Sequence, residues 1–267
     1  MRYNDILTKE GIETHLRSPG IFQIDLRKSV TSTNTVLRDA ARAGMPQGYV
    51  IAAETQTAGK GRQGRSFYSP QGHGVYFSVL LRFEEKSTEA SLITCAAAVA
   101  AAQAIEDVFE KNVGIKWVND LFLDGKKVCG ILTEANINMK DGSIESAVLG
   151  IGINITKPPE GYPKEIEKIA ASLTLENTRE NARCRIIALT LDYFWEYYLN
   201  LSALEFLEQY ISRSILIGRD VYVMFPNSQR LANVITIDNR CRLVVRYENG
   251  EVAVLDSSEV RVKGIEV

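Results

Sequence analysis

The spacing of hydrophobic and polar residues in the first part of the chain predicts two kinds of element. A strand is expected where apolar and polar residues alternate, or where a short apolar run is bounded by turn residues. These patterns predict strands at residues 22–26, 49–53 and 75–81. Apolar residues at helical spacing predict helices at residues 35–43 and 87–111. Gly44 is a natural stop for the first helix, and Ser32 or Thr33 is a suitable N-cap for it.

The second part of the chain changes from long elements to short strands. The longer patterns predict strands at residues 115–123, 128–135 and 147–155, and a helix at residues 183–213. Asp124-Gly125 is the natural hairpin turn between the first two of these strands. From Ile215 onward the pattern predicts short strands at residues 221–223, 231–237, 242–247 and 252–255. Evenly spaced short strands are typical of a small separate barrel.

The composition is that of an ordinary globular protein and argues against several function classes. With 267 residues, 45% hydrophobic and 24% charged, the chain can bury a core in one large domain or in a large and a small one. A formal net charge of −2 argues against a bulk nucleic-acid binder. The four cysteines form no C-x-x-C pair and only two histidines are present, so a zinc cluster is not expected. Reduced thiols, with no export signal and no membrane-spanning run, predict a cytoplasmic protein without a membrane partner.

One glycine-rich loop, residues 54–67, combines backbone freedom with positive charge. Its glycines are Gly59, Gly61 and Gly64, and its cations are Lys60, Arg62 and Arg65. Such a loop can bring amides and cationic side chains onto one phosphate or carboxylate. The loop also satisfies G-x-G-x-x-G and nearly matches a Walker A loop. Both motifs require a following helix, which Pro70, Gly72 and Gly74 prevent, so we reject both interpretations. A solvated loop whose charges serve only solubility remains an alternative.

Four further segments are polar or glycine-rich where a plain core would not place such residues. They are residues 32–34, 116–120, 127–134 and 150–154. Each has an ordinary explanation: helix capping for the first, edge charges or a hairpin flank for the next two, and a β-bulge for the last. However, helix N-termini bind ligands, and glycines within strands allow a ligand to approach closely. Each ordinary explanation is at least as good as a functional one, but the joint appearance of these segments with the cationic loop shifts the balance toward function.

With these segments the chain resembles the biotin–protein ligases, which attach biotin to a lysine of biotin-dependent carboxylases. The resemblance runs from about Phe22 to the C-terminus. It rests on five motifs in the order of the family: Ser32-Thr33-Asn34, residues 55–67 (family form G-R-G-R-x-G-R-x-W), residues 116–120 (K-W-P-N-D), residues 127–134 (K-x-x-G-I-L-x-E) and residues 150–154. Any one motif alone would be weak, but the ordered set of five is highly specific.

The resemblance implies an α+β fold, a mixed β-sheet flanked by helices of the class II synthetase-like kind found in biotin ligases. This catalytic domain would span residues 21–214, preceded by a short lead-in at residues 1–20. A small C-terminal SH3-like β-barrel would follow at residues 215–267. Bifunctional members of the family carry an N-terminal winged helix that represses transcription. The lead-in is too short for one, so a monofunctional enzyme without a nucleic-acid partner is expected.

The resemblance also implies roles for individual residues. The biotin-binding residues would be Ser32, Thr33, Asn34, Gln56, Gly59, Lys60, Gly61, Arg62, Lys127 and Gly130. The ATP-binding residues would be Arg62, Arg65, Phe67, Lys116, Asn119 and Asn154. Catalysis would come from Arg62, Lys127 and Lys116 through positioning and charge neutralisation. Asp120 is a candidate ligand for magnesium.

The implied reaction uses ATP and Mg²⁺ to convert biotin into biotinyl-5′-adenylate, and a carrier lysine then displaces AMP. The protein partner would be a biotin carboxyl carrier protein or acetyl-CoA carboxylase subunit, and a homodimer stays open. Three positions depart from the family: Lys60 replaces arginine, Phe67 replaces tryptophan and Val118 replaces proline. These changes are expected to alter affinity and not the reaction. Two alternatives stay open: a lipoate ligase or lipoyl transferase of the same fold, and a non-catalytic biotin sensor.

Overall fold

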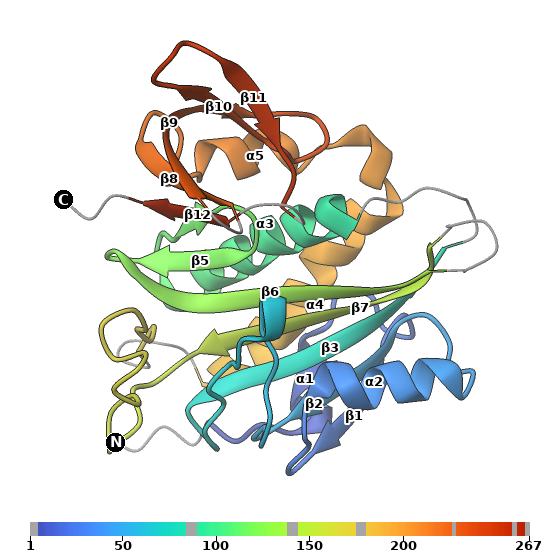
Figure 1. Ribbon diagram of the computed structural model, residues 1–267. Helices are drawn as coiled ribbons and strands as arrows, with labels where there is room; N and C mark the ends of the chain where they lie inside the picture. Colours follow the sequence, from blue (N-terminus) through green and yellow to red (C-terminus); the bar gives the residue numbers. More distant parts are fainter. Residues whose placement is uncertain are drawn as a thin grey trace.

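The computed structural model describes residues 5–83, 90–137, 144–174, 180–225, 228–257 and 261–264. A seven-stranded mixed sheet forms the centre of the molecule (Figure 1). Its strands are β1 (Gln23–Arg27), β2 (Tyr49–Ala53), β3 (Gly74–Arg82), β4 (Gly114–Lys116), β5 (Asp120–Leu123), β6 (Lys126–Ile137) and β7 (Ile144–Asn154). They lie in the order β1-β2-β3-β7-β6-β5-β4, and only β1 and β2 pair in parallel. The strand predicted at residues 22–26 is therefore confirmed, and it lies at the edge of the sheet.

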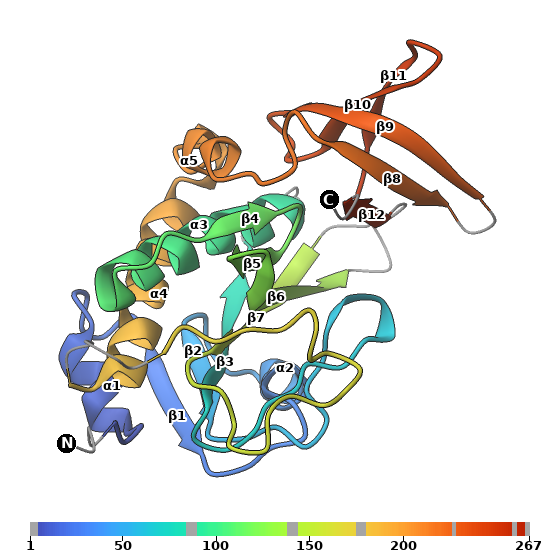
Figure 2. The same cartoon turned by 90° about the vertical axis from the view of Figure 1, so that its left-hand side faces the viewer.

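Helices cover both faces of the sheet. They are α1 (Lys9–His15), α2 (Thr33–Arg42), α3 (Ala90–Phe109), α4 (Ala182–Leu199) and α5 (Leu207–Ser212). Helix α2 lies on one face, whereas α3 and α4 pack on the other (Figure 2). Side chains alternate across a strand, so Ile51 packs with Leu37 under α2, while Val50 joins the large core that contains α3. The central strands are consequently buried on both faces.

Helix α3 is long and apolar enough to cross a membrane by length and composition alone. However, 78% of its apolar window is buried inside the protein. It packs against α4 on its outer side and against β6 of the sheet. These contacts make it a core helix, as an element apolar around its whole circumference requires.

Two predicted elements are interrupted in the structure. The single strand predicted at residues 115–123 is wrong, because Trp117, Val118 and Asn119 form a turn between β4 and β5. The single helix predicted at residues 183–213 is also wrong. It divides into α4, a 3₁₀ turn at Leu201–Ala203, and α5, with Leu204 in the left-handed region at φ 57°. The hairpin turn at Asp124-Gly125 is confirmed, with φ values of 49° and 75°.

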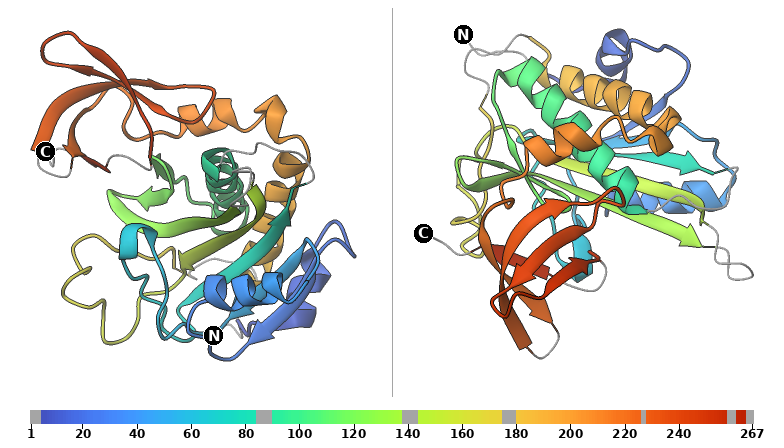
Figure 3. Two further views of the ribbon diagram at one scale, coloured as in Figure 1. Left: turned by 45° about the vertical axis from the view of Figure 1, so that its right-hand side comes forward. Right: turned by 90° about the horizontal axis from the view of Figure 1, so that it is seen from above.

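A second, five-stranded antiparallel sheet follows in the sequence (Figure 3). Its strands are β8 (Asp220–Phe225), β9 (Ser228–Ile237), β10 (Leu243–Tyr247), β11 (Val252–Leu255) and β12 (Arg261–Gly264), in the order β11-β10-β9-β8-β12. The predicted separate all-β unit is present, and β12 was not predicted. The Trp117 indole N–H donates to the Cys241 carbonyl at 2.9 Å. This bond ties the turn between β4 and β5 to the second sheet.

Candidate functional site

Glycines of β6 and β7 form the floor of a cleft on the α2 face of the large sheet. Gly152 pairs with Gly130, and Gly150 pairs with Leu132, in an unbroken register. The β-bulge proposed for residues 150–152 is therefore wrong. A Cβ on Gly150 would lie 1.9 Å from Asn34 Oδ1, and one on Gly152 would lie 2.6 Å from Phe67 Cε1. The absent side chains let α2 and the loop approach the sheet, and they leave a cleft of about 1640 Å³.

One end of the cleft is uncharged, buried and rich in hydrogen-bonding groups. Ser32, Thr33 and Asn34 at the start of α2 are each at most 3% exposed. Gln56 Oε1 accepts from the Thr33 backbone N–H at 2.9 Å, and Gln56 Nε2 donates to Ser69 Oγ at 2.8 Å. Ser32 occupies the N-cap position, but its side chain makes no capping bond. Capping therefore does not use the Ser32 hydroxyl, although the residue occupies the N-cap position.

Both the nitrogen and the oxygen of the Asn34 side-chain amide are hydrogen-bonded within the protein. Its Nδ2 donates to the Leu132 carbonyl at 3.3 Å and to Glu134 Oε2 at 2.8 Å. Its Oδ1 lies 2.6 Å from Ser78 Oγ. Both amide hydrogens and one oxygen lone pair are thus used within the protein, so Asn34 contributes chiefly to the shape of the cleft.

The glycine loop folds into a short hairpin at the edge of the cleft. The Gly61 N–H donates to the Arg65 carbonyl at 2.7 Å, and the Phe67 N–H donates to the Gly59 carbonyl at 2.9 Å. Gln63 and Gly64 turn the chain with φ values of 55° and 75°. Only a three-residue 3₁₀ turn at Arg62–Gly64 is present, and the chain then extends into β3. Rejection of the dinucleotide and Walker A interpretations is therefore confirmed.

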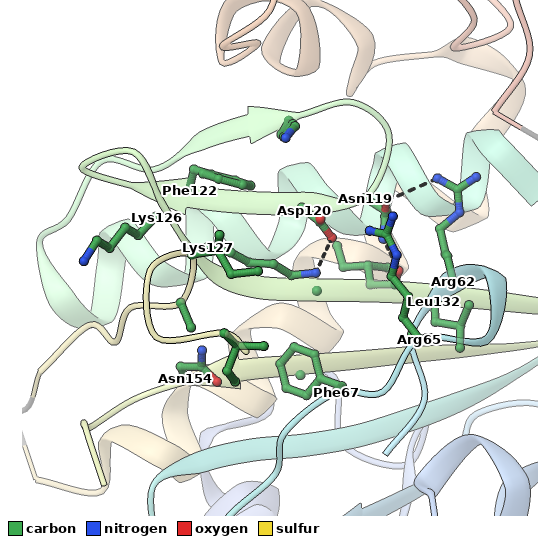
Figure 4. Close-up of a pocket in the computed structure, with 18 of the residues that line it drawn as sticks. Arg62, Arg65, Phe67, Asn119, Asp120, Phe122, Lys126, Lys127, Leu132 and Asn154 are labelled. Carbon is green, nitrogen blue, oxygen red and sulfur yellow. Dashed lines mark hydrogen bonds and ion pairs between the residues drawn. The ribbon is translucent and has the colours of Figure 1, made fainter. Parts of the chain in front are cut away.

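The loop cations point to different partners. Arg62 donates to Asn119 Oδ1 at 3.3 Å and to the Ser257 carbonyl, near the second sheet. Burial lowers the pKa of the Arg62 guanidinium, because it disfavours the charged form. Lys60 Nζ instead lies 3.8 Å from Glu134 Oε1. Arg65 is exposed and lies on the same side of the cleft as Arg62 (Figure 4).

A second group of charged residues lies across the cleft on β5 and β6. Lys127 Nζ is 2.7 Å from Asp120 Oδ1 and 5.9 Å from the centre of the Phe67 ring (Figure 4). The Lys127 backbone is fixed by hydrogen bonds to the chain at Ile169 and Ala171. Lys116 lies on β4, with its Nζ 5.3 Å from the centre of the Phe122 ring. These cations and the loop cations surround one end of the cleft.

The structure brings almost all of the predicted site residues to this cleft. Those lining it are Ser32, Thr33, Asn34, Gln56, Lys60, Gly61, Arg62, Arg65, Phe67, Lys116, Asn119, Asp120, Lys127, Gly130 and Asn154. Gly59 instead borders a smaller neighbouring cavity, where its backbone packs against the Phe67 carbonyl. Asn154 Nδ2 donates to the Ala171 carbonyl at 3.0 Å.

Sequence reasoning missed two parts of the cleft wall. The connection after β7 contributes Ile166, Lys168, Ile169 and Ala170. The chain that leads into β8, the first residue of β8 and the last strand of the second sheet contribute Ile215, Leu216, Gly218, Arg219, Asp220 and Val262. Neither part carries a motif that indicates a ligand site, so only the three-dimensional packing identifies it.

The donor set of the cleft limits how a magnesium ion could be held. Among the described residues, no group of three or more His, Cys, Asp or Glu side chains could hold a metal. The four cysteines are free and buried, and the Asp120 carboxylate is paired with Lys127. Mg²⁺ is commonly bound by substrate phosphates with one or two carboxylates. A magnesium ion carried by a nucleotide would therefore find one carboxylate in the cleft, that of Asp120.

Comparison with known proteins finds a matching family profile, similar sequences and a shared fold. Residues 26–154 match the profile of the Biotin/lipoate A/B protein ligase family. The chain is 35% identical over 164 residues to the Bifunctional ligase/repressor BirA of Bacillus subtilis, covering 61% of this chain and 49% of that protein. It is 28% identical over 246 residues to the Biotin--[acetyl-CoA-carboxylase] ligase of Mycobacterium tuberculosis, covering 89% and 88% of the two chains. The chain thus spans about half the length of the first BirA relatives it matches.

The same fold occurs in a solved structure of a biotin protein ligase from Aquifex aeolicus in complex with biotin and ATP. The TM-score is 0.73 at 23% sequence identity, covering 91% of this chain and 99% of that chain. The predicted architecture, a mixed sheet flanked by helices and followed by a small β unit, is confirmed by this likeness and by the strand topology.

Proposed function

We propose that this chain, a member of the biotin/lipoate A/B protein ligase family, is an ATP-dependent ligase that activates biotin and transfers it to a carrier lysine. One observation carries the proposal: a single cleft joins a buried, uncharged, hydrogen-bonding end to a cationic end. Biotin has a neutral ureido ring at one end and a carboxylate at the other. The neutral end of biotin thus matches the uncharged end of the cleft, and its carboxylate matches the cationic end.

The uncharged end would bind the ureido ring. Ser32 and Thr33 offer hydroxyl groups, and Gln56 fixes Thr33 from the opposite side. A buried polar site of this kind favours a ligand that satisfies its groups, because an unsatisfied buried group costs free energy. The glycine floor at Gly130 and Gly152 would lie beneath the ligand, which requires the Phe67 ring to move from its position there.

The cationic end would carry out adenylation. The biotin carboxylate attacks the α-phosphorus of ATP, a P–O bond forms, and pyrophosphate leaves. Both reactants are anionic, so the barrier falls when cations neutralise the charge that converges on phosphorus. Arg62, Lys116 and Lys127 would supply this charge, with Lys60 holding the carboxylate. Arg65, Phe67, Asn119 and Asn154 would hold the rest of the nucleotide.

Transfer would use the same positioning without a covalent enzyme intermediate. The carrier lysine amine attacks the acyl carbon of the mixed anhydride, an amide bond forms, and AMP leaves with the anhydride oxygen.

Magnesium would be bound by the ATP phosphates during adenylation and would neutralise their charge, and Asp120 is the candidate protein ligand. The carrier would be a biotin carboxyl carrier protein or the corresponding acetyl-CoA carboxylase subunit.

The two separate sheets support the proposed division of the chain into two domains. Residues 21–214 would form the biotin- and ATP-binding domain, and residues 215–267 the small C-terminal domain. The Arg62 contact to Ser257 supports a contribution of the C-terminal domain to the site. We further propose that the protein acts in the cytoplasm, because its four cysteines are free.

A direct test is to incubate the protein with ATP, magnesium, biotin and a biotin carboxyl carrier domain, and to measure the mass of the carrier. The expected result is a gain of one biotinyl group, with one pyrophosphate released per biotin. Lipoate in place of biotin should give no product. Modification by lipoate but not biotin would identify a lipoate ligase instead. Biotin binding without transfer would identify a sensor.

A further inference from the structure

Ser78 on β3 belongs to none of the motifs above and does not line the cleft, yet it lies behind the uncharged end. It is 0% exposed, a rare environment for a serine. Its Oγ lies 2.6 Å from Asn34 Oδ1 and 2.8 Å from Thr33 Oγ1. The Ser78 hydroxyl therefore contacts two residues of the α2 N-terminus at once.

The partners of Asn34 decide which way the Ser78 proton points. Asn34 Nδ2 faces two acceptors, the Leu132 carbonyl and the Glu134 carboxylate, so its Oδ1 must face Ser78. An amide oxygen can only accept, and the separation of 2.6 Å requires a proton between the two oxygens. The Ser78 proton is consequently donated to Asn34.

This assignment fixes the Thr33 hydroxyl in turn. The Ser78 proton is already used, so the 2.8 Å contact between the hydroxyls must contain the proton of Thr33. Thr33 thus donates into the protein interior and presents only lone pairs to the cleft, which it lines. Gln56 Oε1 already accepts from the Thr33 backbone N–H and offers only a longer contact, at 3.2 Å, to this hydroxyl.

We propose that Ser78 is a specificity-determining positioning residue, which makes Thr33 an acceptor for a ring N–H of the ligand. The proposal rests on the proposed function, in which this end binds the biotin ureido ring. A ureido ring carries two N–H donors, whereas the dithiolane ring of lipoate carries none. A site with a fixed acceptor rejects the ring that cannot donate, because the acceptor would then be buried without a partner.

Ser78→Ala tests the proposal, with Thr190→Val as the matched control. Thr190 is also 0% exposed, and its hydroxyl donates within α4, to the Ile186 carbonyl. Each change removes one buried hydroxyl, but only Ser78 is connected to the cleft. In Ser78→Ala the KM for biotin should rise about tenfold, the usual effect of one lost hydrogen bond, with an unchanged KM for ATP. Thr190→Val should change Tm and neither KM.

Desthiobiotin tests whether the effect of Ser78→Ala acts through the ureido ring. This ligand keeps the ureido ring of biotin and lacks the sulfur ring, so Ser78→Ala should raise the KM for desthiobiotin by the same factor as the KM for biotin. A biotin KM unchanged by Ser78→Ala, or a rise for biotin without one for desthiobiotin, would overturn the proposal. Absence of biotin transfer by the wild-type protein would instead overturn the proposed function. In that case, calorimetry of biotin binding to the wild-type protein and to Ser78→Ala would still test the role of Ser78, because it needs no turnover.

Discussion

Lys127 Nζ lies 2.7 Å from Asp120 Oδ1, directly beside the glycine floor of the cleft. The carboxylate is on β5 and the ammonium on β6, and Asp120 pairs in register with Gly130 of β6. The pair therefore places one cation at a defined point of the cleft wall. An anionic ligand can reach this cation from the open side of the cleft.

Lys127→Ala should slow adenylate formation by about a hundredfold or more, the typical loss for one preorganised charge donor. Tm should change little, because Lys127 is partly exposed and fills no core space. Single-turnover pyrophosphate release gives the rate. The matched control is Lys126→Ala, an exposed neighbour whose side chain points away from Lys127 (Figure 4). Equal rates in the two variants would remove Lys127 from the proposed mechanism.

Lys60→Arg should lower the KM for biotin a few-fold, because guanidinium binds a carboxylate with two parallel hydrogen bonds and ammonium does not. Lys60→Met should raise the same KM by about tenfold, through loss of a charge-assisted hydrogen bond. Both are measured by steady-state kinetics at saturating ATP. A KM for biotin that is the same in all three proteins would show that Lys60 interacts only with Glu134, its partner in the present structure.

The glycine floor gives a prediction about stability. Gly150→Ala would place a methyl group 1.9 Å from the firmly held Asn34 Oδ1, so the helix start must shift. We expect a loss of about 1–3 kcal/mol in the free energy of unfolding, the usual cost of overpacking. For Gly152→Ala the three atoms nearest to the new methyl group all belong to the Phe67 ring, which lies in the loop, so we expect a smaller loss. Urea unfolding compares the two. A larger loss for Gly152→Ala would show that the Phe67 ring is fixed and Asn34 is not.

Secondary structure was predicted best where a short segment contains the physical cause of its own conformation. Strand alternation located β3, Gly44 located the end of α2 with a φ of 90°, and Asp124-Gly125 located a hairpin turn. The cleft residues were found because glycines and cations are costly in a plain core. Ser78 carries no such signal, since its role depends on partners 44 and 45 positions away in the chain.

The two wrong predictions of secondary structure concern residues 115–123 and 183–213, where the local pattern is not sufficient. Residues 115–123 are apolar enough for one strand, and the turn at Trp117 is stabilised by Cys241, 124 residues later. Residues 183–213 keep a helical pattern, but α4 ends at Leu199, and Leu204, in the left-handed region, ends the 3₁₀ turn that follows. Long-range contacts of this kind leave no trace in a window of neighbouring residues.

The glycine loop gives the last prediction, which concerns its response to ligands. The hairpin is held by few hydrogen bonds, and its tip, from Gln63 to Ser66, is exposed. Arg65 lies in that exposed tip, whereas Arg62 is bonded to Asn119 and Ser257. Trypsin should therefore cleave the ligand-free protein first after Arg65, because exposed loop tips are preferred cleavage sites.

Biotin with ATP should protect the same bond. The adenylate supplies a phosphate for the loop cations and a base against which Phe67 can pack, so the loop loses freedom and water is excluded from the reactive anhydride. ATP alone should protect little, since the loop would lack the ligand that lies beneath it. Arg65→Gln is the control, in which this first cleavage must disappear while slower sites remain. Equal cleavage rates with and without the adenylate would mean that the loop is a static phosphate-binding element and does not close over the site.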